Sequence, residues 1–238
     1  IGDSTTTDTF SAASLTQASG TGTTTINASV TTTDNVSVTN TTIDVNNSIT
    51  TSNVATGTGT VTLTGAISLD SNITTENSGI TLDGAVDLDG GATITLDTDS
   101  AGGGDVSITG DLTSTSTDAL TITAGTGSFS VDGSTSGLGD VLINNAQNVT
   151  IGDSTTTDKF SAASLTQATG SGTTTINASV STSGDINISN TNIDLNNDLT
   201  TTDTATGNGI VTLTGAISLD SNITTENSGI TLDGAVDL

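Results

Sequence analysis

The sequence predicts an all-β fold wound as a parallel β-helix, also called a β-solenoid, and two observations predict it. Aliphatic residues alternate with polar ones in short bursts, such as Val61-Thr62-Leu63 and Ile80-Thr81-Leu82. This period of two is that of a half-buried β-strand. The bursts recur every 19 to 26 residues, so we expect coils of that length with two or three short strands each.

The expected strands follow one another along the chain with Gly, Asn, Asp, Ser or Thr between them. β-Branched residues dominate and good helix formers are nearly missing, so propensity and pattern agree. Tight corners are expected at Gly65, Gly84, Gly90 and Asn46-Asn47. The bursts that predict strands are Val36/Val38, Ile43/Val45, Val61/Leu63, Ile67/Leu69, Ile80/Leu82, Val86/Leu88, Ile94/Leu96, Val106/Ile108, Leu120/Ile122, Phe129/Val131, Val141/Ile143 and Val149/Ile151.

The chain also repeats itself over a longer distance. Residues 1–88 return with scattered substitutions as residues 151–238, and residues 61–88 are identical to residues 211–238. We therefore expect residues 1–150 to form the first unit of a continuous solenoid and residues 151–238 a partial second unit, in a segment of a longer array. In such repeat proteins function usually lies in length, stiffness and a displayed surface.

The composition excludes several classes of protein. Thr and Ser make up more than a third of the chain, while Trp, Tyr, Met, Pro, Cys, His and Arg are absent. One basic residue against 26 acidic ones gives a net charge of −25, which repels nucleic acids and anionic membranes. No apolar run approaches the roughly 20 residues of a membrane-spanning helix. We expect no nucleic-acid partner and no membrane-spanning segment in this window.

A string of immunoglobulin-like sandwiches is the alternative all-β interpretation. It predicts repeats near 100 residues and a buried Trp or a Tyr corner. Neither feature is present, and the short spacing between bursts favours the solenoid.

The bursts of residues 60–75, TVTLTGAISLDSNITT, and residues 79–98, GITLDGAVDLDGGATITLDT, carry a resemblance to a known class of proteins. They resemble the large repetitive exoproteins and adhesins of bacteria, of the filamentous-haemagglutinin or autotransporter-passenger type. The resemblance covers most of both units as a periodic bias. It implies a right-handed parallel β-helix that is secreted and displayed at the cell surface, as an adhesin or structural fibre.

Carboxylates that follow the bursts are the candidate metal ligands. If coils stack in register, some of them line up about 5 Å apart, and Ca²⁺ can neutralise such a ladder. The alternative is that each Asp caps its own turn and points into water. The calcium candidates are Asp70, Asp83, Asp89 and Asp97.

No residue pattern predicts catalysis. Parallel β-helices also include polysaccharide lyases and hydrolases, whose carboxylates lie beside basic and aromatic side chains. Here the only basic residue is Lys159, which replaces Thr9 of the other unit, so we interpret it as a surface substitution. We expect no enzyme activity, no catalytic residue and no organic cofactor.

The sequence therefore supports two functional hypotheses. The first is a structural component of an extracellular filament, which assembles end to end or laterally. The second is an adhesin that binds a cell, a carbohydrate or a mineral surface through its exposed Thr, Asn and Asp side chains. Thr-x-Thr arrays, such as Thr60, Thr62 and Thr64, also occur in ice-binding solenoids. We interpret them here as exposed β-formers, because the coil lengths vary.

Overall fold

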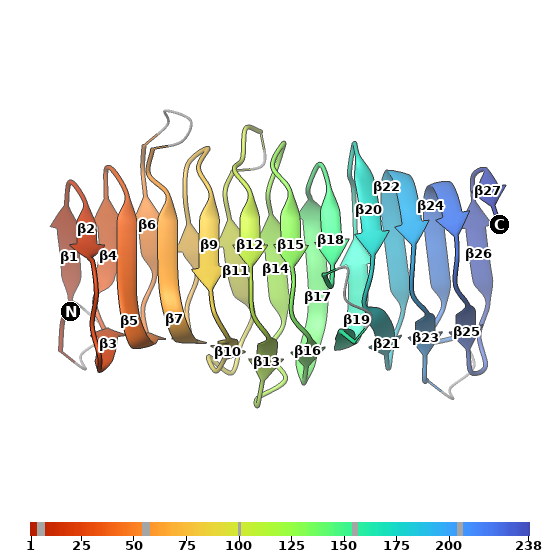
Figure 1. The fold of residues 1–238 in the computed structure, drawn as a ribbon, viewed down its shortest axis with the longest axis horizontal. Coiled ribbons are helices and arrows are strands. Elements are labelled where there is room, and N and C mark those ends of the chain that lie inside the picture. Colours follow the sequence, from red (N-terminus) through yellow and green to blue (C-terminus); the bar gives the residue numbers. More distant parts are fainter. Residues whose placement is uncertain (4–7, 54–57, 100, 154–156, 204–206) are drawn as a thin grey trace.

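The computed structural model shows a rod of stacked coils. It describes residues 1–3, 8–53, 58–99, 101–153, 157–203 and 207–238. Within these residues the chain forms 27 strands and no helix. Figure 1 shows the coils following one another in chain order, from the N-terminal end to the C-terminal end of the rod. The chain makes about 10 coils, so the prediction of a parallel β-solenoid is confirmed.

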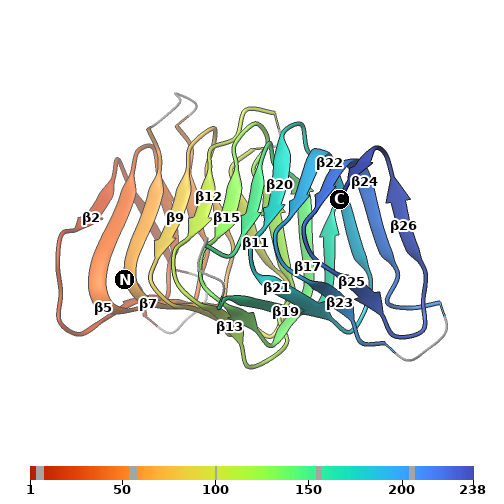
Figure 2. The same cartoon turned by 45° about the vertical axis from the view of Figure 1, so that its right-hand side comes forward.

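Each coil has three sides, which we name A, B and C by the strands that stack on them; Figure 2 shows the sides from a second direction. Side A holds β1 (Thr9–Ala12), β4 (Ser29–Thr32), β6 (Ile49–Thr51), β8 (Ile73–Thr74), β11 (Ile94–Asp97), β14 (Leu120–Thr123), β17 (Leu138–Asn145), the second half of β19 (Lys159–Gln167), the first halves of β22 (Ile186–Leu195) and β24 (Val211–Leu219), and β26 (Ile230–Asp233).

Side B holds β2 (Leu15–Gln17), the first halves of β5 (Val36–Val45) and β7 (Val61–Leu69), β9 (Ile80–Asp83), β12 (Val106–Ile108), β15 (Phe129–Val131), β18 (Val149–Ile151), β20 (Thr173–Ile176), the second halves of β22 and β24, and β27 (Val236–Asp237). Side C holds β3 (Thr23–Ile26), the second halves of β5 and β7, β10 (Val86–Leu88), β13 (Leu112–Ser114), β16 (Thr135–Ser136), the first half of β19, β21 (Ser179–Thr182), β23 (Leu199–Thr201) and β25 (Ile223–Thr225).

All the paired strands are parallel, and their register gives the length of each coil. Val61 pairs with Ile80, and Ile80 pairs with Val106, so consecutive coils on side B contain 19 and 26 residues. These are the two limits that the sequence predicts. Because the side chain of every second residue points inward, pairing in this register places aliphatic residues above one another from coil to coil.

The core is a continuous aliphatic column inside the rod. Val61, Leu63, Ile80 and Leu82 are each fully buried, as are their counterparts in most other coils. Each such side chain contributes roughly 1.5–3 kcal/mol from burial before conformational entropy is subtracted. The core therefore extends along the whole rod, and each coil is stabilised by the coils on either side of it.

Glycine occupies two corners where neighbouring coils approach closely. At Gly65 the backbone has φ 145° and a Cβ atom would lie 2.0 Å from the carbonyl oxygen of Asn40. At Gly84, directly above, φ is 134° and a Cβ atom would lie 2.2 Å from the carbonyl oxygen of Gly65. Gly65 lets β7 turn from side B to side C, and Gly84, between β9 and β10, lets the next coil turn at the same corner while the coils stay in hydrogen-bonding contact.

Buried threonines close many of the loops between sides. Thr98 Oγ1 donates a hydrogen bond to the carbonyl oxygen of Gly104 at 2.7 Å, and Thr182 Oγ1 donates to that of Gly184 at 2.7 Å. Thr51 and Thr75 donate to Gly59 and Ser78 in the same way. A buried hydroxyl is tolerated because the loop carbonyl satisfies it.

The two repeat units form one uninterrupted ladder. On side A, Val141 of β17 pairs with Leu165 of β19, and on side B, Val149 of β18 pairs with Thr174 of β20. The second unit therefore continues the solenoid of the first, with hydrogen bonding and core packing carried across the boundary.

Candidate functional site on the surface of the rod

Small hydroxyl side chains follow side B along the length of the rod. In register from coil to coil, the outward residues next to the core column are Thr62, Thr81, Ser107, Ser130, Thr150, Thr175, Asp194, Ser218 and Asp237. Neighbouring hydroxyls lie close enough to interact, as Ser130 Oγ and Ser107 Oγ do at 3.3 Å. This row is a polar, uncharged surface over most of its length and becomes acidic toward its C-terminal end.

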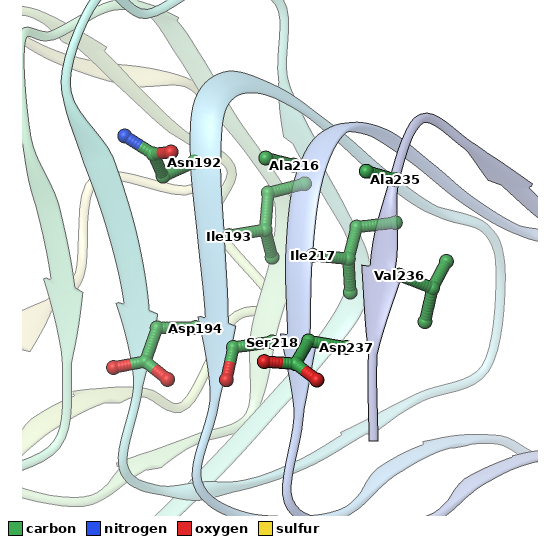
Figure 3. Close-up of a pocket in the computed structure, with 9 residues that line it drawn as sticks. All are labelled: Asn192, Ile193, Asp194, Ala216, Ile217, Ser218, Ala235, Val236 and Asp237. Atoms are coloured by element: carbon green, nitrogen blue, oxygen red, sulfur yellow. The ribbon is translucent and has the colours of Figure 1, made fainter.

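A groove of about 430 Å³ crosses three coils at that end. Figure 3 shows three rows of side chains across β22, β24 and β27. The rows are Asn192, Ala216 and Ala235; Ile193, Ile217 and Val236; and Asp194, Ser218 and Asp237. Alanine side chains are short, so the surface is hollowed along the first row. The third row gives the groove one acidic edge.

The same groove occurs once more, 150 residues earlier. There it has a volume of about 250 Å³ and is lined by Thr42, Ala66, Ile67, Ser68, Ala85, Val86, Asp87 and Thr113. Ala66 and Ala85 correspond to Ala216 and Ala235 of the second unit. Thr113 Oγ1 donates a hydrogen bond to Asp87 Oδ1 at 2.9 Å, which fixes the acidic edge in this copy. We call the two copies the alanine grooves.

The four calcium candidates lie at three different corners. Asp70 and Asp89 follow β7 and β10 on side C, whose last residues pair in register, so these two lie on neighbouring coils. Asp83 ends β9 on side B, where its Oδ1 accepts a hydrogen bond from Thr109 Oγ1 at 2.9 Å. Asp97 ends β11 on side A and accepts one from the backbone N–H of Asp99 at 2.9 Å.

Metal binding by these four residues stays a prediction. Among the described residues, no three Asp, Glu, His or Cys side chains gather as a metal ion requires. Asp97 caps its own turn, as the alternative interpretation of these carboxylates predicts, whereas Asp83 bonds to the neighbouring coil.

Asp70 is the carboxylate most affected by its surroundings. Its Oδ1 atom is buried without a hydrogen-bond partner. Burial raises the pKa of Asp70 above its ordinary value, and the negative charges of Asp89 and Asp44 raise that pKa further. Protonation of this group therefore relieves an unfavourable charge inside the corner.

A polar cluster recurs in both units at the corner between two sides. In the second unit Thr174 Oγ1 donates to Gln167 Oε1 at 2.5 Å, and Asn190 Nδ2 donates to Thr174 Oγ1 at 2.9 Å. In the first unit, the bonds from Thr24 to Gln17 and from Asn40 to Thr24 measure 2.6 and 2.7 Å. We call these two sets of residues the Gln–Thr–Asn clusters.

The cluster of the second unit lies deep in the rod. Gln167 is 2 % exposed and Asn190 is 5 % exposed, and Gln167 Nε2 is buried with no hydrogen-bond partner. Asn190 Oδ1 accepts a hydrogen bond from the backbone N–H of Thr191 at 2.8 Å. A buried polar network of this kind is costly unless it is satisfied, so it specifies one arrangement of the coils.

Sequence reasoning overlooks these clusters, although a signal is present. In the burst Leu165-Thr166-Gln167 the third residue stands at an inward position, where the other bursts have an aliphatic residue. Asp118 is overlooked as well: it is 2 % exposed, and its Oδ2 accepts a hydrogen bond from Ser114 Oγ at 3.0 Å.

Side-chain amides form short ladders at one corner of each unit. Asn46 Nδ2 donates to Asn27 Oδ1 at 2.9 Å, and in the second unit Asn196 Nδ2 donates to Asn177 Oδ1 at 3.0 Å. These amides join neighbouring coils at the corner.

Comparisons with known proteins give no relative for this chain. No protein family model, no curated protein and no solved structure matches it. The described part of the chain contains no helix long and apolar enough to cross a membrane.

Proposed function

We propose that the chain is a structural component of an extracellular or cell-surface filament. The single observation that carries this proposal is the uninterrupted ladder across the boundary between the two units, from β17 to β19 and from β18 to β20. A solenoid that continues through its sequence repeat without a break gains length with every unit. Its contacts remain those between neighbouring coils.

The physical properties of the rod suit this role. Parallel main-chain hydrogen bonds run along its axis on all three sides, which makes it stiff. The net charge of −25 keeps the rods soluble and apart at low ionic strength. Trypsin-like proteases need Lys or Arg, and the chain offers one, Lys159, so it resists one class of extracellular protease.

Contact between coils also provides a route to assembly. Ile230 and Val236 of the last coil are 45 % and 41 % exposed, whereas their counterparts Ile80 and Val86 are covered by the next coil. A coil of the same kind, from a continuing chain or a second molecule, buries this apolar surface and pairs with the free strand edge.

Electron microscopy of the purified chain at several concentrations tests the proposal. About 10 coils spaced by about 4.8 Å predict single rods near 48 Å long. We expect longer rods of the same width as concentration or salt increases. Compact particles, or rods that never exceed the length of one molecule in any condition, contradict it.

Adhesion is the second candidate function, and the recurrence of the alanine groove favours it. Both grooves combine a hollow row of alanines with an acidic edge, a surface that suits a hydroxylated or cationic ligand such as a carbohydrate or an amine. Screening on immobilised glycans and on cells tests this function.

A pair of matched variants sharpens the adhesion test. Replacing Ala66 and Ala216 by Leu fills both grooves, whereas replacing the exposed Ala13 by Leu adds the same bulk elsewhere. Adhesion through the grooves predicts that binding falls at least about tenfold in the first variant and is unchanged in the second. Equal binding by both variants rejects the grooves as the adhesive surface.

A further inference from the structure

The repeat of the sequence and the repeat of the fold do not coincide. Starting from Thr62 on side B, the strand register leads through Thr81, Ser107, Ser130, Thr150, Thr175 and Asp194 to Ser218, seven coils further on. The residue that corresponds to Thr62 in the second unit is Thr212, not Ser218. Thr212 lies on side A, one side earlier in the same coil.

One unit of 150 residues therefore falls one side short of seven complete coils. It makes six coils and two further sides. We infer that successive units are turned about the axis of the rod by one side of the coil, about 120° for a three-sided coil. The structure thus assigns the same surface residues to a different side in each unit, and only every third unit repeats the orientation of the first.

Independent features of the two units agree with this rotation. The alanine groove lies on side C in the first unit and on side B in the second. Phe10 stacks under Val30 on side A, whereas its counterpart Phe160 stacks under Val180 on side C. The contacts between neighbouring coils are nevertheless the same in both units, because Thr9 pairs with Ser29 as Lys159 pairs with Ser179.

The rotation has a consequence for binding by an array of these units. This consequence rests on the proposed filament. No side of the rod shows the same residues in consecutive units. A flat, periodic substrate such as a crystal face therefore meets matching residues only at every third unit. A site contained within a single unit points in a different direction in each of three successive units.

Distances between paired spin labels test the rotation in this chain, whether or not filaments form. The chain has no cysteine, so two introduced cysteines carry the only labels. One pair is Thr62→Cys with Thr212→Cys, which joins corresponding residues of the two units. The other pair is Thr62→Cys with Ser218→Cys, which lies in one register column.

We expect the second pair to be closer in space although it is further apart in sequence. Seven steps of about 4.8 Å separate its Cα atoms by about 34 Å along the axis. Thr212 is a third of a coil nearer to Thr62 along the axis, but it lies on another side of the rod. The separation across the rod therefore makes the distance between the labels at Thr62 and Thr212 the longer one. Equal distances, or a shorter distance for the Thr62 and Thr212 pair, overturn the inference.

A second set of variants guards against local misfolding. Thr81→Cys is combined with Thr231→Cys, its counterpart in the repeat, or with Asp237→Cys, which lies in its register column. The same order of distances is expected. Circular dichroism of each variant confirms that the strands are retained, and a chain that keeps its strands but reverses the order contradicts the rotation. Neither result bears on the filament proposal, which electron microscopy tests separately.

Discussion

Ile80 and Ile230 are the same residue of the repeat in two surroundings: Ile80 is fully buried between coils, whereas Ile230 is 45 % exposed on the last coil. The flanking residues are identical. The pair therefore isolates the effect of a covering coil from that of local sequence.

Replacing Ile80 by Ala is expected to cost about 2–5 kcal/mol, because it leaves a cavity that the coils on either side cannot fill. The same replacement at Ile230 is expected to cost about 1 kcal/mol or less, since its side chain already contacts water. Denaturant unfolding of each variant, with hydrogen exchange to locate the change, measures both. Equal losses at the two positions would show that neighbouring coils contribute little to stability.

Glycine corners provide a second test of the stacking. Replacing Gly84 by Ala places a Cβ atom against the carbonyl oxygen of Gly65 and forces an L-residue to φ 134°. We expect a loss of about 1–3 kcal/mol or more, since the strained backbone conformation alone costs that much. Gly22 is the matched control because a Cβ atom there meets nothing within 4 Å, so its replacement by Ala is expected to be nearly neutral. Thermal unfolding followed by circular dichroism compares the two variants.

The buried Gln–Thr–Asn cluster makes a third prediction. Asn190→Leu removes the donor to the buried Thr174 Oγ1 and the acceptor of the N–H of Thr191, a bond that is only partly buried. We expect a loss of about 1–3 kcal/mol for each group that is left unsatisfied. Asn187→Leu, which changes an outward residue of the same strand, is the control.

Hydrogen exchange around β20 and β22 reads out the result. Protection there should fall in Asn190→Leu and in the equivalent first-unit variant Asn40→Leu around β3 and β5, but not in Asn187→Leu. Unchanged protection in all three variants would mean that the cluster does not hold the corner.

Much of this fold can be predicted from the sequence, because the inward positions of most sides are marked by pairs of aliphatic residues. Val61 with Leu63 and Ile80 with Leu82 give both the strand period and the length of the coil. Short-range alternation and coil spacing are local properties, so they are visible without the structure.

The number of sides in a unit cannot be predicted in the same way. The side formed by β16 presents Thr135 inward instead of an aliphatic residue, and Thr51 and Thr98 turn inward because loop carbonyls satisfy their hydroxyls. Such sides carry no clear alternation of polarity, so counting bursts misses them. Consequently the rotation between units, and the sides on which the calcium candidates lie, emerge only from the register of the strands.

Acidic pH should stabilise the rod, and Asp70 supplies a specific test. Burial and the charges of Asp89 and Asp44 raise the pKa of Asp70 in the folded chain above its unfolded value. Between these two values the folded state binds more protons than the unfolded state, so stability is lost as pH rises through the folded pKa and is gained as pH falls. Burial likewise raises the pKa of Asp132, which adds to the effect in the same direction.

Asp70→Asn is therefore expected to raise the melting temperature at pH 7, and this gain should shrink as the pH falls and Asp70 becomes protonated. Asp220→Asn is the matched control, because Asp220 is the same residue of the second unit and is exposed, whereas Asp70 is half-buried. Melting curves between pH 4 and pH 7, at low and high salt, separate this local effect from the general repulsion of a chain with a net charge of −25. If Asp70→Asn and Asp220→Asn shift the melting temperature equally at every pH, the crowded corner around Asp70 is not the source of the pH dependence.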